Sequence, residues 1–182
     1  TATSIESLTL AGGTTSTGTL TLGAVTLTDG AGTQTVTITN AGNVAFTTGS
    51  ATITADTVTA TGVAGTFGTS ALPLVLANTA GVSFTGGAGN TFVSGSSAAD
   101  VITTGIGNDT IVSGGGADVI NSGAGNDTVT GGSAAEIINL GSGADTVTGA
   151  GAIDTIDLGL ADAAADTVIL SGIIAVADRD VI

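Results

Sequence analysis

Acidic residues recur at every ninth position in the second half of this 182-residue chain. Eight consecutive nonapeptides run from Gly86 to Asp157, and seven of them have an acid at the sixth position, whereas the first has Thr91. The acids are Asp100, Asp109, Asp118, Asp127, Glu136, Asp145 and Asp154. Carboxylates at this spacing beside Gly-rich turns favour Ca²⁺, which accepts carboxylate and carbonyl oxygens together. The alternatives are a solvated acidic face and, less favoured because no aromatic residue accompanies the acids, a glycosidase carboxylate pair.

The rest of the composition excludes most other chemistry. Against 15 acidic residues the chain has one base, Arg179, and it contains no His, Cys, Tyr or Lys. It therefore lacks the usual general base, thiol nucleophile and Schiff-base amine, and we expect it not to be an enzyme. A formal net charge of −14 disfavours nucleic acid and anionic membranes as partners. No apolar run approaches the roughly eighteen residues that direct membrane insertion requires.

Two segments, Thr104 to Ile111 and Ser122 to Val129, read Gly-x-Gly-Asn-Asp-Thr followed by Ile or Val. This pattern is a known signature of calcium-binding β-helices, and it closely resembles the RTX (repeats-in-toxin) family. The resemblance implies an all-β, right-handed parallel β-roll, in which each repeat forms a turn and a short strand and two repeats complete a rung. It also implies type I secretion with an uncleaved C-terminal signal, which residues Ile173 to Ile182 would begin.

An eighteen-residue superperiod agrees with two repeats per rung. Odd repeats always have Gly at the fourth position, whereas three of the four even repeats have Ala there. The eighth position is Val or Ile throughout, so we expect it to point into a core one side chain deep. By the family pattern, the best calcium sites lie between Asp109 and Asp127 and between Asp127 and Asp145. The even pairs, which are Asp100/Asp118, Asp118/Glu136 and Glu136/Asp154, are expected to bind less well, and Thr91 weakens the case for a site next to Asp109.

Thr dominates the chain before Leu76. Thr alternates there with aliphatic residues in short runs typical of strands, and the expected strands are Ser7–Leu10, Thr19–Leu22, Ala24–Thr28, Thr35–Thr39, Ala51–Thr54 and Thr57–Thr61. Uneven spacing leaves open whether this segment continues the same solenoid, and it disfavours an ice-binding array. Pro73 indicates a junction. We divide the chain into a Thr-rich segment (1–76), a junction (77–85), the roll (86–157), and a degenerate last rung with the start of a C-terminal region (158–182).

The thin core and the stacked acids predict that calcium is a folding cofactor. Val101, Val119 and Ile137 stand at the outward-pointing seventh position of even repeats, where they would form an exposed apolar ladder that either the first half of the chain or another protomer covers. Two functions follow as hypotheses. The first is a structural, self-assembling protein of the cell surface, such as a surface-layer or filament subunit, and the composition loosely resembles that of bacterial surface-layer proteins. The second is a calcium-binding module of a larger secreted enzyme or toxin.

Overall fold

The computed structural model describes residues 7–11, 19–22, 35–39, 43–46, 51–53, 57–60, 67–68, 73–77, 79–159, 164–169 and 174–177. Their regular elements are β-strands: β1 Ser7–Ala11, β2 Thr19–Leu22, β3 Thr35–Thr39, β4 Asn43–Phe46, β5 Ala51–Ile53, β6 Thr57–Thr59, β7 Leu74–Leu76, β8 Ser83–Thr85, β9 Phe92–Ser94, β10 Val101–Ile106, β11 Thr110–Val112, β12 Val119–Ala124, β13 Thr128–Thr130, β14 Ile137–Ser142, β15 Thr146–Thr148, β16 Asp154–Asp157, β17 Thr167–Ile169 and β18 Ile174–Ala177. Nowhere in these ranges is there a helix of the length and hydrophobicity needed to cross a membrane.

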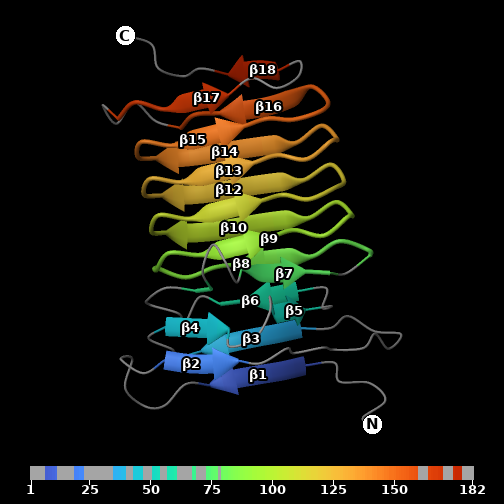
Figure 1. Ribbon diagram of the computed structural model, residues 1–182, viewed down its shortest axis with the longest axis vertical. Helices are drawn as coiled ribbons and strands as arrows, with labels where there is room; N and C mark the ends of the chain where they lie inside the picture. The colour runs from blue at the N-terminus through green and yellow to red at the C-terminus, as the bar shows by residue number, and fades with distance from the viewer. Residues whose placement is uncertain are drawn as a thin grey trace.

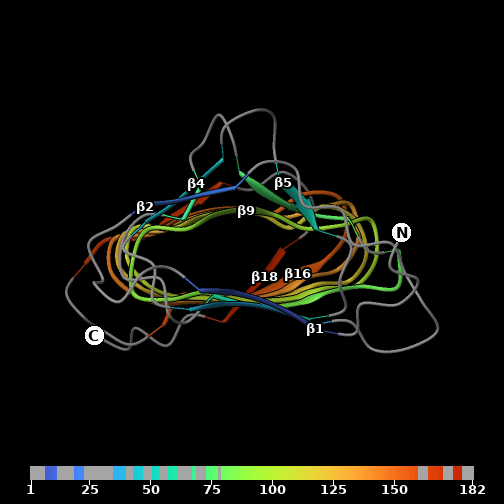
Figure 2. The same ribbon diagram turned by 90° about the horizontal axis from the view of Figure 1, so that it is seen from below.

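The strands stack into a parallel β-solenoid whose two main sheets face each other (Figure 1). Among the described residues, the long sheet contains nine strands in the order β1-β3-β6-β8-β10-β12-β14-β16-β18, and the short sheet contains seven in the order β17-β15-β13-β11-β9-β7-β5. Strands β2 and β4 form a separate parallel pair. Seen end-on, successive rungs superimpose as a flattened ring with one sheet on each side (Figure 2). The all-β roll predicted from the sequence is thereby confirmed.

The register of the sheets follows the eighteen-residue superperiod. In the long sheet Ile102 pairs with Ile120, which in turn pairs with Ile138. In the short sheet Ile111 pairs with Val129 in the same way. Odd repeats therefore supply the short sheet and even repeats supply the long sheet, so that each residue type is stacked on its equivalent in the neighbouring rung.

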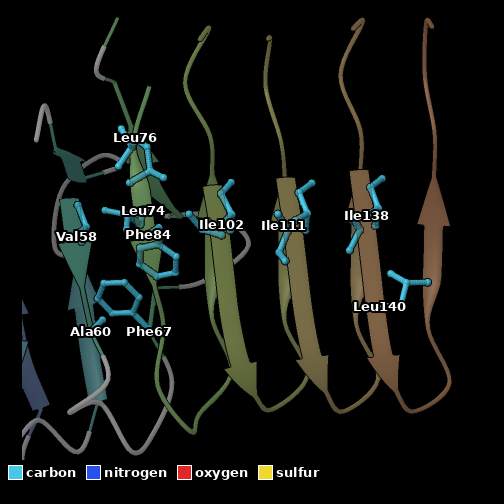
Figure 3. Close-up of a cluster of buried hydrophobic side chains, with 14 of the residues drawn as sticks. Val58, Ala60, Phe67, Leu74, Leu76, Phe84, Ile102, Ile111, Ile138 and Leu140 are labelled. Atoms are coloured by element: carbon cyan, nitrogen blue, oxygen red, sulfur yellow. The ribbon is translucent and has the colours of Figure 1, made fainter. Parts of the chain in front are cut away.

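The core is a double row of aliphatic side chains between the sheets (Figure 3). All eight residues predicted to point inward are at most 1% exposed, namely Val93, Ile102, Ile111, Ile120, Val129, Ile138, Val147 and Ile156. β-Branched residues suit this position because their stiff side chains pack well on a pleated surface. Towards the N-terminal end the row continues through Val58 and Val36, and the ring of Phe84 stacks on that of Phe67 at a centroid distance of 6.1 Å.

The Thr-rich segment joins the same solenoid. Strand β6 pairs with both β3 and β8 in the long sheet, and β7 links β5 to β9 in the short sheet. Five of the strands expected from the Thr alternation are present as β1, β2, β3, β5 and β6, whereas Ala24–Thr28 lies outside the described residues. Strands β7 and β8 fall at the Pro73 junction, where no strand was expected. The domain boundaries drawn from composition remain a prediction.

Candidate metal centre

The solenoid has two series of turns, one at each edge of the sheets. The odd turns (residues 86–91, 104–109, 122–127 and 140–145) lead from the long sheet to the short sheet, and the even turns (95–100, 113–118, 131–136 and 149–154) lead back. Each turn ends at the sixth position of its repeat, immediately before the inward-pointing strand. The acids at this position are all at most 1% exposed, from Asp100 to Asp154. They are therefore interior groups, and the solvated acidic face considered for them is not what the structure has.

One carboxylate oxygen of each Asp at this position accepts a hydrogen bond from a main-chain N–H of the preceding rung. Asp109 Oδ1 accepts the N–H of Thr91 at 2.7 Å, and Asp127 Oδ1 accepts the N–H of Asp109 at 2.8 Å. The same bond joins Asp100 to Val82 (2.7 Å), Asp118 to Asp100 (2.8 Å), Asp145 to Asp127 (2.8 Å) and Asp154 to Glu136 (3.1 Å). At the first rung Thr91 donates its main-chain N–H to Asp109, so this position does not require a carboxylate.

The second carboxylate oxygen differs between the acids, because in Asp100 it accepts the N–H of Ser96 at 2.6 Å. Oδ2 of Asp109, Asp118, Asp127 and Asp154 has no hydrogen-bond partner within the described residues. Thr104 Oγ1 donates to the Ser122 carbonyl (2.8 Å) and Ser122 Oγ donates to the Leu140 carbonyl (2.7 Å), although both hydroxyls also lie near enough to Asp109 and Asp127 to lower the pKa of these acids. No Lys, Arg or His occurs between residues 79 and 159. Buried carboxylate oxygens without a basic residue nearby fit a hard cation, and Ca²⁺ binds such all-oxygen sets.

Burial also makes the charged form of these groups unfavourable in the absence of a cation. Desolvation raises the pKa of Asp109, Asp118 and Asp127 above the usual value of 3.8, against the lowering effect of hydrogen bonds from a nearby hydroxyl and from a main-chain N–H. The pKa of Glu136 rises from 4.5 to about 7, first because the group is buried and then because the Asp154 carboxylate lies beside it. Protons and divalent cations can each relieve this cost, and at neutral pH a cation is the more effective of the two.

Glycine shapes the odd turns. Gly105, Gly107, Gly123 and Gly125 all have φ between +106° and +128°, a range that side chains oppose by about 1–2 kcal/mol. A Cβ on Gly125 would also overlap the carbonyl of Gly107 in the preceding rung, and the glycines at the second position are stacked equally tightly. The odd turns thus place main-chain carbonyls one above another next to the buried acids, which is an arrangement that supplies oxygen ligands.

Asparagine at the fifth position ties the odd turns together in the opposite direction. Asn90 Oδ1 accepts the N–H of Asn108 at 2.9 Å, Asn108 accepts that of Asn126 at 2.9 Å, and Asn126 accepts that of Ala144 at 3.0 Å. Each Asn therefore reaches the following rung, whereas each Asp reaches the preceding one. Sequence reasoning identified this Asn pattern as part of the repeat but assigned it no role, because its partner lies eighteen residues away.

Asp166 is a ladder residue that was not among the predicted ligands. Its Oδ1 accepts the N–H of Asp145 at 2.9 Å across 21 residues, three more than the regular spacing. The signal in the sequence was Asp166-Thr167-Val168, which repeats the strand motif twelve residues after Asp154. Within the described residues, no three Asp, Glu, His or Cys side chains gather as a ready-made metal cluster. The assignment of individual ligands therefore stays a prediction.

Comparison with known proteins identifies the repeats. The family model of the RTX calcium-binding nonapeptide repeat, which spans four copies, matches residues 85–120, 112–147 and 130–162. These ranges contain all seven predicted ligands and end before Asp166. No curated protein and no solved structure gives a significant match to the chain.

Proposed function

Residues 85–162 belong to the RTX calcium-binding nonapeptide repeat family, and on that basis we propose that this chain is a calcium-dependent, self-assembling structural subunit of an extracellular layer or filament. RTX repeats bind Ca²⁺ and form a structural module that is not itself catalytic, and proteins that carry them are typically secreted. The proposal adds two elements to these properties: a set of ligands within the roll, and an outer surface suited to association with further copies of the chain.

The ligands proposed are carboxylate oxygens of the turn acids together with the stacked turn carbonyls. In the odd turns these are the pairs Asp109/Asp127 and Asp127/Asp145. In the even turns they are Asp100/Asp118, Asp118/Glu136 and Glu136/Asp154. Bound calcium supplies the positive charge that this basic-residue-free interior lacks. The acids keep successive rungs in register through their Oδ1 atoms, and the hydrophobic row aligns the strands once the turns have formed.

Calcium binding of this kind would couple folding to location. Calcium is near 10⁻³ M outside cells and scarce inside them, and extracellular modules are tuned to about that concentration. An acidic chain without calcium would stay unfolded through a type I secretion channel and would fold on reaching the outside. We infer a place at the cell surface from this calcium-dependent folding, from the Thr-, Gly- and Ala-rich composition and from the uncharged exterior of the roll.

The single observation that carries the assembly proposal is an uncharged exterior with an apolar stripe. All charged side chains between residues 79 and 156 are the buried acids of the turns, so the outer faces over this range expose no charge. On the long sheet, Val101 is 45% exposed and Ile137 is 49% exposed, with the half-buried Val119 stacked between them. We call these three residues the long-sheet stripe. Of the described Thr-rich strands, β1, β3 and β6 continue the long sheet end to end, and Val101 and Ile137 of the stripe stay exposed.

A second copy of the chain is the proposed occupant of this stripe. Charge repulsion normally keeps exposed sheet faces apart, and nothing on this exterior supplies it. The equivalent row on the short sheet begins with Phe92 and continues as Thr at residues 110, 128, 146 and 167, which leaves that row more polar. Burial of the long-sheet stripe would contribute roughly 25 cal/mol per Å² of apolar surface.

Sedimentation with and without calcium tests the proposal, with Val119→Asp as the variant and Thr128→Asp, on the short-sheet row, as its matched control. We expect calcium to convert the wild type and Thr128→Asp into large particles, and Val119→Asp to remain small while acquiring the same calcium-induced β-structure. A wild-type chain that folds with calcium but stays monomeric would favour the alternative function, a calcium-binding module of a larger secreted enzyme or toxin. Loss of β-structure in Val119→Asp would mean that the stripe is internal packing.

A further inference from the structure

Glu136 is unlike the other acids at its position. In each neighbouring Asp, Oδ1 accepts a hydrogen bond from a main-chain N–H of the preceding rung. By that rule Glu136 would accept the N–H of Asp118. It does not, because both Oε1 and Oε2 are buried without a hydrogen-bond partner of acceptable geometry. Glu136 is therefore the acid in the described ladders whose two oxygens both lack a well-formed hydrogen bond, with only the Gly132 N–H near enough to lower its pKa, and the side chain is only 1% exposed.

Room for the longer side chain comes from the first position of the same turn. Ser113 occupies that position opposite Asp118, whereas Gly131 occupies it opposite Glu136, as Gly95 and Gly149 do opposite Asp100 and Asp154. A Cβ built on Gly131 would lie 3.0 Å from Glu136 Oε2, which is tighter than ordinary side-chain contacts. The step from Ser113/Asp118 to Gly131/Glu136 thus removes a side chain at one position and lengthens the carboxylate that faces it.

A third carboxylate oxygen lies next to this pair. Asp154 uses Oδ1 to accept the Glu136 N–H at 3.1 Å, which fixes its carboxylate against Glu136, and its Oδ2 is buried without a partner. The two carboxylates lie close enough for Asp154 to raise the pKa of Glu136. Two acids in adjacent even turns therefore bring three such oxygens together, whereas the Asp109/Asp127 pair of the odd turns brings two.

We propose that Glu136 binds calcium with both carboxylate oxygens, together with Oδ2 of Asp154, and so forms a site of a different type from the Asp sites of the repeat. The proposal rests on calcium binding by the repeats and adds the mode of ligation of one residue. A two-oxygen Glu raises the coordination number, which suits Ca²⁺ and does not suit the tight octahedron of Mg²⁺. It reverses the expectation that the Ala-containing even turns hold only weaker versions of the odd sites.

The chain permits an unusually direct test because it contains two Glu residues, Glu6 and Glu136. In a Glu6→Gln background, glutamate labelled with ¹³C at the side-chain carboxyl leaves one labelled carboxylate, and its infrared stretching bands report how it binds a metal. Chelation by both oxygens narrows the separation between the antisymmetric and symmetric bands relative to the free ion, whereas ligation by one oxygen widens it. We expect narrowing on calcium saturation.

Circular dichroism and calcium titration of the same sample separate the possible failures. Calcium uptake and β-structure with an unchanged or widened Glu136 band would overturn the two-oxygen ligation and leave calcium binding intact. A sample that takes up no calcium would overturn the calcium-dependent function on which the proposal rests. As a second variant, Gly131→Ser with Glu136→Asp recreates the preceding Ser/Asp turn, and we expect it to fold with calcium and to bind one ion fewer or more weakly at this turn. Unchanged stoichiometry and affinity would also count against the site.

Discussion

The odd and even turns occupy equivalent places in the solenoid but hold their rungs together differently. In the odd turns glycine carbonyls stack tightly, Asn126 and its equivalents bond to the following rung, and the Asp ladder is unbroken from Asp109 to Asp166. In the even turns Ala replaces several glycines, no Asn occurs at the fifth position, and Glu136 interrupts the ladder. Regular turns therefore favour a repeated, coupled ion site, whereas the irregular turn provides room for a distinct one.

This contrast separates two quantities that are easily confused. The number of ions bound depends on how many carboxylate oxygens remain free, and Glu136 leaves two. The cooperativity of binding depends on bonds that join one rung to the next, and the odd series has these in both directions. We therefore expect the even side to bind one ion well without transmitting the effect along the roll.

The largest expected difference between the two series is seen when a central acid is removed. Asp127 belongs to two odd sites and accepts the Asp109 N–H, so Asp127→Ala removes a ligand from both sites and leaves a buried donor unsatisfied. Glu136→Ala removes a ligand from the two even sites that contain it, but it removes no rung-to-rung bond of its own side chain. Isothermal titration calorimetry should show a greater loss of calcium cooperativity or stoichiometry for Asp127→Ala. Equal or reversed losses would show that the odd ladder is not the more strongly coupled one.

Glycine substitutions give the next largest contrast. Gly125 in an odd turn has φ of +122° and packs against the Gly107 carbonyl, whereas Gly115 in an even turn is not in the left-handed region and has its nearest neighbours at 3.4 Å. We expect Gly125→Ala to lower the calcium-saturated free energy of unfolding by at least about 1–2 kcal/mol. Gly115→Ala should change it by less than about 0.5 kcal/mol. Urea unfolding followed by circular dichroism measures both free energies. A loss for Gly125→Ala as small as that for Gly115→Ala would show that the odd turns tolerate side chains.

In the calcium-free chain, the effect of pH on β-structure should separate Glu136 in the even turns from the acids of the odd turns. The pKa values of Asp109, Asp127 and Glu136 are raised in the fold, so the folded form binds protons more tightly than the unfolded form. Their contribution to stability is full below the unfolded values and is lost as pH rises through the folded ones. For Glu136 that window runs from 4.5 to about 7. We expect lowering the pH from 7 towards 4.5 to increase calcium-free β-structure, and Glu136→Gln to flatten this response, with Glu6→Gln as control.

A smaller effect concerns the Asn bonds. Asn126 is exposed and donates no ligand in the proposed sites, but its Oδ1 accepts the Ala144 N–H. Removing it in Asn126→Ala should lower the free energy of unfolding by about 0.5–1.5 kcal/mol, the usual net value of one hydrogen bond. Asn139→Ala, which removes only a side-chain bond to Asn121 on the long sheet, should lower it by less and should leave calcium cooperativity unchanged. The opposite order would mean that the Asn bonds do not tie odd rungs together.

The regular part of the fold could be predicted from the sequence because its period is independent of any distant contact. The inward positions such as Ile120 and the buried acids such as Asp127 follow from nonapeptide counting alone. Strand β8 could not be predicted, because Ser83, Phe84 and Thr85 show too short an alternation and their pairing with Val101, Ile102 and Thr103 determines the strand. Asp166 was missed because a three-residue insertion moves it out of the period, although its bond to Asp145 restores the ladder.

The hydrogen bonds within the turns could not be predicted from the sequence, for a similar reason. Which carboxylate oxygens remain free depends on bonds to residues eighteen positions away, as between Asp127 and Asp109. The space at Gly131 that accommodates Glu136 is visible only when the turn has been closed. Composition could rank the even sites below the odd ones, but it could not reveal that one even acid keeps both of its oxygens.

Circular dichroism during removal of calcium by EGTA tests the central claim most directly, namely that calcium folds residues 86–157. The buried acids lack a counter-charge and the core is one side chain deep, so we predict that most of the β-signal is lost on chelation at neutral pH and returns when calcium is restored. A β-signal that persists unchanged after complete chelation would contradict the account, because the roll would then be stable with its acids unneutralised.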